Sequence, residues 1–376
     1  MARRVWHMIF KEFLQSLRDK RMRMIIFGVP VIQLLMFGYA VNTDVRNIAL
    51  AVVDLDQSAE SREFVSRFVC SGHFQVKGYL EHENRIREIL DTAGAQAVLR
   101  INAGFGRAVN SGQTATAQLL VDGADSNTAG IILGYASKIV RRYSQVLMES
   151  RLARTQGVVT PLLKVELQSR AWHNENLESR HYYVPGVMAT IVTLISLLLT
   201  AMAIVREKEL GTIEQILVTP IRPGEFVLGK TIPFALISFV DVIVVSVVGT
   251  LWFGIPIRGN PLCLLLGASM FLLSTLGVGL LISTVSRTQQ QALMTGFFFF
   301  MPAMMLSGFM FPIANMPEPI QWLTLLNPLR HFLVVIRGVF LKGVGLDVLW
   351  PQVLALALLG VFTLSVTVKR FHKTLS

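Results

Sequence analysis

Long apolar runs separated by polar segments dominate this sequence. A segment of about 20 mainly apolar residues can cross the hydrocarbon core of a bilayer as a helix. Of the 376 residues, 52% are hydrophobic and 16% are charged, which is too apolar for an ordinary soluble chain. Because the apolar residues gather in blocks, the pattern indicates a polytopic α-helical membrane protein. We expect six transmembrane helices, at about 24–41, 184–205, 232–253, 262–284, 291–313 and 349–368.

The distribution of charge indicates which side of the membrane each segment occupies. The formal net charge is +11, and the excess lies beside the apolar runs, in residues 1–23 and in the C-terminal tail. Lys and Arg mark cytoplasmic flanks, so we expect both termini in the cytoplasm and no role in binding nucleic acid. Tyr39, Trp252 and Trp350 fall at predicted outer ends, where aromatic residues settle.

Two further parts precede the second apolar run. Residues 1–23 are amphipathic, which predicts an interfacial helix on the cytoplasmic surface, although a plain solvated arm is the alternative. Residues 42–183 alternate strand patterns, such as Ile48–Val53 and Ala97–Ile101, with helix patterns such as 127–157. This alternation predicts a compact α/β domain outside the cytoplasm.

Residues 184–376 contain the other five predicted spans. Pro302 and Pro312 should kink the fifth span, because each removes a backbone hydrogen bond. Beyond it, residues 314–345 hold two apolar runs that are too short to cross the membrane, separated by Asn327-Pro328. We expect a re-entrant or interfacial hairpin at the outer face.

A charged bridge, Arg206–Pro220, joins the second and third spans. Lipid does not accept its charges, so the bridge must face water or a protein partner. Leu210, Ile213 and Ile216 repeat at helical spacing, and Pro220 ends the helix. A solvated loop helix is the simplest interpretation.

This bridge also resembles the cytoplasmic coupling segment of ABC-2 type transporter permeases, whose pattern is approximately RE-x-E-x-GT-x-E-x-[IL]-x-x-[ST]-P. The resemblance continues in Arg170–Asn174 leading to Tyr183–Gly186, and in Asn327-Pro328 with His331. The layout is similar to the subgroup with a large external domain between the first two spans. The positions that match the coupling pattern are Arg206, Glu207, Glu209, Gly211, Thr212, Glu214, Ile216, Thr219 and Pro220.

The resemblance implies the membrane subunit of an ATP-driven exporter in the bacterial inner membrane. Such a permease forms a homodimer or a heterodimer with a related permease, and it pairs with a cytoplasmic ATPase subunit that binds ATP and magnesium. A periplasmic adaptor is a further candidate partner. Drugs, lipids and glycan precursors all remain open as substrates. The residues that would dock the ATPase, within the segment 206–230, are Arg206, Glu207, Glu209, Gly211, Thr212 and Glu214.

One nucleotide-binding motif is matched by its letters alone. Gly224–Thr231 fits G-x-x-x-x-G-K-[ST], but a phosphate loop must follow a buried strand and open a helix. Here Pro220 and Pro223 precede the motif, and a membrane span follows. We therefore expect no ATPase site in this chain, and we interpret Lys230 as an anchor of the third span at the inner interface.

Asp241 lies in the middle of the third apolar run, and an intramembrane carboxylate is a candidate functional residue. It is a candidate for the translocation path or for a proton site, or it is held by a structural hydrogen bond to a group such as Gln33. The rival functions are a proton-coupled secondary transporter that uses Asp241 and a membrane scaffold whose outer domain binds a partner. Cys70, Cys263 and the seven histidines show no metal-ligand spacing, so we expect no metal, cofactor or catalytic site.

Overall fold

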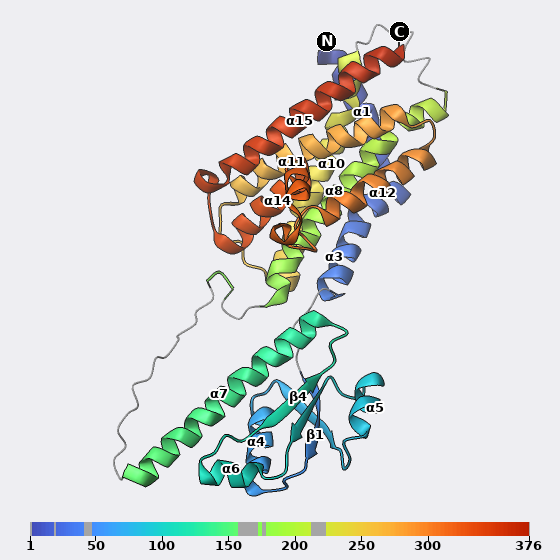
Figure 1. Cartoon of the computed structure of the whole chain (residues 1–376). Coiled ribbons are helices and arrows are strands. Elements are labelled where there is room, and N and C mark those ends of the chain that lie inside the picture. Colours follow the sequence, from blue (N-terminus) through green and yellow to red (C-terminus); the bar gives the residue numbers. More distant parts are fainter. Residues whose placement is uncertain are drawn as a thin grey trace. The chain divides into compact units, whose positions relative to one another are not determined.

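The protein, analysed as a computed structural model, divides into two compact units (Figure 1). The structure describes residues 2–18, 20–40, 47–156, 172–174, 178–211 and 223–375. One unit contains residues 1–43 together with 170–376, and the other contains residues 44–169. The predicted external segment, 42–183, is longer than the second unit because residues from Ser179 onward belong to the helix α8.

The smaller unit is an α/β domain built around a four-stranded sheet with the order β2-β1-β3-β4. Strand β1 is parallel to β2 and β3, whereas β4 is antiparallel to β3. The hydroxyl of Ser58 accepts a hydrogen bond from the backbone N–H of Ser61 at 3.0 Å and so caps α4. The elements are β1 (Ile48–Asp54), α4 (Ala59–Cys70), β2 (Phe74–Tyr79), α5 (Arg85–Asp91), β3 (Ala97–Ile101), α6 (Phe105–Ser111), β4 (Ala117–Val121) and α7 (Ser126–Gln156).

Both faces of this sheet are covered by apolar side chains. On one face, α4 and α7 supply Phe64, Phe68 and Tyr143 to a core with the strands. On the other face, a smaller cluster includes Ile86 and Ile89 of α5. Strand β1 lies between two neighbours and is apolar on both sides, which explains why its sequence is a continuous apolar run rather than an alternating one.

The larger unit is helical. Its elements are α1 (Ala2–Arg18), α2 (Lys20–Arg23), the π-helix η1 (Met24–Gly28), α3 (Val29–Ala40), α8 (Ser179–Glu209), α10 (Pro223–Phe253), α11 (Pro261–Val285), α12 (Gln289–Met305), the 3₁₀ turn η2 (Ile313–Asn315), α13 (Glu318–Thr324), α14 (Pro328–Arg337), the π-helix η3 (Gly338–Lys342) and α15 (Leu346–Leu375).

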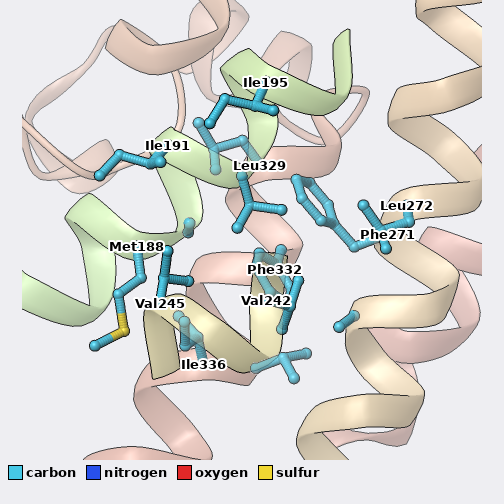
Figure 2. Packing of buried hydrophobic residues seen from close by; sticks show 14 of the residues in the cluster. Met188, Ile191, Ile195, Val242, Val245, Phe271, Leu272, Leu329, Phe332 and Ile336 are labelled. Atoms are coloured by element: carbon cyan, nitrogen blue, oxygen red, sulfur yellow. The ribbon is translucent and has the colours of Figure 1, made fainter. Parts of the chain in front are cut away.

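Helix α8 lies at the centre of this unit. Within its most apolar window, 83% of the residues are buried by the rest of the protein, against 17% for α15. It packs against α3, α10, α11, α12 and α14. Figure 2 shows the core between these helices, where Met188 and Ile191 of α8 meet Val242 of α10 and Phe332 of α14. The ring of Phe332 also stacks on Phe271 of α11 at a centroid distance of 4.2 Å.

Helices α8 and α10 run antiparallel. Glu207, near the end of α8, contacts Lys230, near the start of α10, while Met188, near the start of α8, packs beside Gly249, near the end of α10. We call the end of the helical unit that holds Glu207 and Lys230 the proximal end, and the opposite end the distal end.

Helices α11 and α15 run parallel to α8, so α15 also ends at the proximal end. The Ser283 hydroxyl accepts hydrogen bonds from the backbone N–H groups near the end of α8. Along α11 and α15, Ser274 donates to the carbonyl of Leu356, and Thr367 donates to the carbonyl of Gly277. Both chain termini are marked at this end of the helical unit (Figure 1).

The expectation of six full spans is only partly met. Four helices are long and apolar enough to cross a membrane, namely Ser179–Glu209, Gly224–Phe253, Pro261–Val285 and Leu346–Arg370. The first predicted span corresponds to Met24–Ala40, a shorter apolar helix. The fifth, expected over 291–313, ends at Met305, because the chain turns there and Gly308 adopts a φ of +82°.

A bent pair of helices occupies most of the segment expected as an outer hairpin. Helix α13 and the combined α14–η3 helix meet at an angle of 77°. Asn327 caps α14 by accepting a hydrogen bond from the backbone N–H of Leu329 at 3.1 Å, and its amide nitrogen donates to the carbonyl of Ala303 at 2.6 Å. The bend is therefore fastened to α12. Counted as one span, the pair gives up to five spans among the described residues.

The close approach of α8 and α11 makes a testable prediction. A Cβ at Gly279 would lie 1.9 Å from Oγ1 of Thr200 and 2.9 Å from the carbonyl oxygen of Leu197. We expect Gly279→Ala to destabilise the protein by about 1–3 kcal/mol, because the two helices must move apart. Gly224→Ala is the control, since a Cβ there meets no atom within 4 Å. Equal thermal stability of the two variants in detergent would contradict this packing.

Candidate coupling site

The charged residues Arg206–Glu209 form the last turn of α8. Glu207 is buried, Arg206 and Lys208 are half-buried, and Glu209 is exposed. The helix ends at Glu209, and Gly211 follows with a φ of +70°, a conformation that glycine adopts without a steric penalty. Four of the matched coupling positions are therefore placed. Thr212 and Glu214 lie outside the described residues.

A buried cluster of charges joins α8 to α1 and α10. Lys230 Nζ lies 2.6 Å from Oε1 of Glu12 and 2.9 Å from Oε1 of Glu207. All three residues are at most 5% exposed. Lys11, whose side chain is largely exposed, lies 3.7 Å from the same oxygen of Glu207. Two carboxylates and two ammonium groups thus meet where three helices converge.

The helices come close enough for this contact because a glycine, Gly229, lies at the crossing of α1 and α10. A Cβ at Gly229 would lie 2.7 Å from the sulfur of Met8, so glycine lets α1 cross α10 directly. Glu12 follows Met8 by about one helical turn and therefore reaches Lys230, the residue after Gly229. The amphipathic N-terminal helix is thereby fixed to the helical unit by a specific ionic contact as well as by its apolar face.

The two following residues of α8 contact the other side of the unit. Lys208 Nζ donates to the carbonyls of Thr284 at 2.8 Å, Ser286 at 3.2 Å and Ser283 at 3.4 Å. These carbonyls end α11, where a cation is favoured by the helix dipole. One oxygen of Glu209 accepts from the side-chain amide of Gln289 at 2.6 Å, at the start of α12.

The sequence predicts that Glu207 and Glu209 face an ATPase partner, and this role stays a prediction. The structure adds contacts within the chain that the sequence does not show, because Glu207 is buried and Glu209 accepts a hydrogen bond from Gln289. Lys230 was interpreted as an interfacial anchor, yet it is 2% exposed and paired. Glu12 received no role. Two features of the sequence could have pointed to this pairing: Glu12 is an acidic residue on an otherwise basic amphipathic helix, and Lys230 lies at the edge of an apolar run.

The segment that matches the phosphate-loop pattern is not a loop. Helix α10 starts at Pro223 and includes Gly224–Thr231 within its first turns. Its backbone N–H groups are therefore largely committed to helical hydrogen bonds, and the ammonium group of Lys230 is held by two carboxylates. A phosphate would have to displace both carboxylates from the ammonium group. This geometry does not fit the way in which such loops hold nucleotides.

Asp241 is 1% exposed, and neither carboxylate oxygen has a hydrogen-bond partner among the described residues. The hydroxyls of Ser238 and Ser246 on the same helix, and Oε1 of Gln33, are likewise buried without a partner there. The hydrogen bond considered between Asp241 and Gln33 is thus not formed. In the described part of the chain, no group of three His, Cys, Asp or Glu side chains is arranged to hold a metal ion.

The buried charge cluster predicts a selective loss of stability. Lys230→Ala leaves two carboxylates without their shared partner in a site shielded from water, so we expect a cost of about 3–5 kcal/mol. Lys11→Ala removes an exposed ammonium group and should cost under about 1 kcal/mol. Thermal unfolding of the purified variants in detergent measures both effects. Similar losses for the two variants would show that Lys230 is not the centre of the cluster.

Comparison with known proteins is consistent with this architecture. A family model described as "ABC-2 family transporter protein" matches residues 20–369. The "Probable multidrug ABC transporter permease YbhR" of Escherichia coli (strain K12) is 33% identical over 373 residues, covering 99% of each chain. "Probable multidrug ABC transporter permease YbhS" is 31% identical over 91% of this chain and 89% of its own. "Inner membrane transport permease YhhJ" is 30% identical over 99% of this chain and 98% of its own, both from the same organism. The chain therefore belongs to the ABC-2 family of transporter proteins, as a membrane permease subunit of an ATP-binding cassette transporter.

Proposed function

We propose that this permease exports drug-like molecules across the inner membrane, using ATP hydrolysed by a separate cytoplasmic subunit. The proposed substrate class rests on the relatives named as probable multidrug permeases. The assignment to the inner membrane rests on the relative named as an inner membrane permease. Lipids and glycan precursors are the competing substrates. The observation that carries the mechanism is the buried contact of Lys230 with Glu12 and Glu207, next to the segment that matches the coupling pattern.

The proximal end is proposed to receive the ATPase through residues 206–230. The last turn of α8 contacts α1, α10, α11 and α12 through Glu207, Lys208 and Glu209. A displacement of this turn therefore acts on four other helices together. Glu209 and Gly211 are exposed and, with Thr212 and Glu214, are the residues proposed to touch the partner. Glu207 transmits the displacement inside the permease, and Arg206 supports the same turn.

We further propose that two permeases form the transport pathway. The chain is similar over nearly its whole length to two different permeases of one organism, 33% and 31% identical. A pathway made by two copies or by this chain with a related permease is compatible with that similarity. Asp241 is proposed to lie along the pathway, because a buried carboxylate without a partner is costly unless it is used.

The proposed topology puts the proximal end in the cytoplasm and residues 44–169 outside. Basic residues lie near both termini, and α1 and the end of α15 share the proximal end. At the distal end, Tyr39 and Trp252 are exposed and joined by a hydrogen bond of 3.0 Å, as expected at a membrane interface. A periplasmic adaptor would then reach the α/β domain.

Cysteine labelling tests this topology. With Cys70 and Cys263 replaced by serine, we expect an impermeant thiol reagent to label Glu88→Cys in the α/β domain of intact cells. Gln215→Cys should be labelled only after the membrane is permeabilised, because charged flanks hold its segment inside. Labelling of Gln215→Cys from outside would contradict the orientation.

Charge reversal tests the coupling role. If Glu209 and Glu214 only face water, each lysine variant should cost under about 1 kcal/mol. If they meet a partner surface, a lysine introduces an unpaired charge into a desolvated contact, which costs about 2–5 kcal/mol of binding. We expect Glu209→Lys and Glu214→Lys to lose the ATPase in a pull-down while inserting normally.

Two controls make this result specific. Glu209→Gln keeps an oxygen that can accept the hydrogen bond from Gln289 and separates loss of charge from loss of that contact. Glu318→Lys reverses an exposed charge at α13, away from the proximal end, and should bind the ATPase normally. If both reversal variants bind the ATPase fully and transport fully, the segment has no coupling role and is a solvated loop.

A further inference from the structure

Arg337 is a charged side chain at the distal end of the helical unit that the coupling mechanism does not use. It is the last residue of α14. The residue as a whole is half-buried, and its Nε and Nη2 are shielded from solvent and have no hydrogen-bond acceptor among the described residues. A buried donor without an acceptor is unfavourable, and a charged one is more so.

The contact that Arg337 does make leaves these two donors free. Its Cζ lies 3.9 Å from the centroid of the Tyr182 ring, in a cation–π contact. Such a contact uses the face of the guanidinium plane, whereas its N–H groups point outward within the plane. Nε and Nη2 lie on one edge of that plane. This edge forms the two-pronged fork that binds both oxygens of a carboxylate or phosphate.

The charged groups just before Tyr182 pair with one another. The carboxylate of Glu178, which precedes α8, lies 2.6 Å from Arg180 and 3.7 Å from His181, whereas Nε and Nη2 of Arg337 have no acceptor among the described residues. The N-terminus of a long helix contributes a positive partial charge of its own.

Aromatic rings enclose the fork. Tyr182 and Tyr183 meet edge-to-face at 5.3 Å, and Tyr183 meets Phe309 in the same way at 6.3 Å. A Cβ at Gly186 would lie 2.4 Å from the Phe309 ring and 3.3 Å from Nη2 of Arg337. Glycine at this position thus lets the Phe309 ring lie over α8 beside the guanidinium. Phe309 follows Gly308, the left-handed residue in the turn after α12.

The depth of the site indicates the source of the anion. Gly249 of α10 packs beside Met188 and Val184 of α8, so the exposed Trp252, one turn further along α10, lies near the level of Tyr182. Exposed Trp and Tyr side chains mark the headgroup region of a bilayer. At that depth the abundant oxyanion is the phosphodiester of a phospholipid.

We propose that Arg337 is a lipid-binding residue, whose Nε–Nη2 edge holds the phosphate of a phospholipid headgroup at the distal interface. The Phe309 ring moves aside on its turn to admit the phosphate, while Tyr182 keeps the guanidinium plane in position. This site does not depend on which substrate the permease exports.

The test compares lipids that differ in the phosphate alone. The purified full-length protein, depleted of lipid in a detergent without phosphate, is unfolded thermally with phosphatidylcholine or with diacylglycerol of the same acyl chains. We expect phosphatidylcholine to stabilise the wild type more than diacylglycerol does, and Arg337→Gln to abolish this difference. Native mass spectrometry should show the matching loss of retained phospholipid.

Two variants keep the result specific. Arg258→Gln removes an exposed arginine before α11 and should keep the phosphate-dependent stabilisation. Arg337→Lys keeps the charge without the fork, should retain less lipid than the wild type, and replaces Arg337→Gln if that variant does not fold. Equal behaviour of the wild type and the Arg337 variants would overturn the proposal. Equal stabilisation by inorganic phosphate alone would overturn the lipid assignment and give the site to a soluble anion.

Discussion

The arrangement of the proximal end depends on one buried lysine. In a site shielded from water, the ammonium group of Lys230 is tolerated because Glu12 and Glu207 both contact it, and those carboxylates are tolerated because of Lys230. Each partner belongs to a different helix. Any motion that separated α1, α8 and α10 here would leave a buried charge unpaired, so the three helix ends are held together far more strictly than apolar contacts alone would require. Apolar side chains can slide past one another at small cost, whereas an ion pair fixes position.

Helical geometry explains how one short run of charges fastens so many neighbours. Successive residues of an α-helix point about 100° apart, so Glu207, Lys208 and Glu209 face three different directions. Glu207 contacts α1 and α10, Lys208 contacts the carbonyls that end α11, and Glu209 contacts the start of α12. A charged run that resembles a solvated loop in the sequence is therefore a junction of the helical unit. The same geometry makes Glu209 the described acidic member that is most available to a partner.

The sequence predicted what local patterns determine and failed where partners lie far apart in the chain. Strands β1 and β3 follow from their sequence patterns, and the four long apolar helices follow from length and hydropathy. The count of six spans is confirmed only in part, because run length does not reveal that α12 ends at Met305 and is followed by a turn with a left-handed residue, Gly308. The pairing of Lys230 with Glu12 crosses more than half of the chain, and no spacing in the sequence encodes it. The coupling pattern pointed to the last turn of α8 but could not show that Glu207 is buried there against Lys230.

Charged groups inside the helical unit differ in whether an opposite charge lies beside them. Lys230 forms ion pairs with Glu12 and Glu207, and this arrangement is a structural one. Asp241, in both carboxylate oxygens, and Arg337, in Nε and Nη2, have no hydrogen-bond partner among the described residues. A buried polar atom without a hydrogen-bond partner lowers stability, and this cost is the reason for the proposal that each residue meets a ligand from outside the chain. The two lie at different depths, Asp241 in the middle of α10 and Arg337 beside the first turn of α8, and have opposite formal charge. They are therefore suited to different ligands, and a single bound molecule does not account for both.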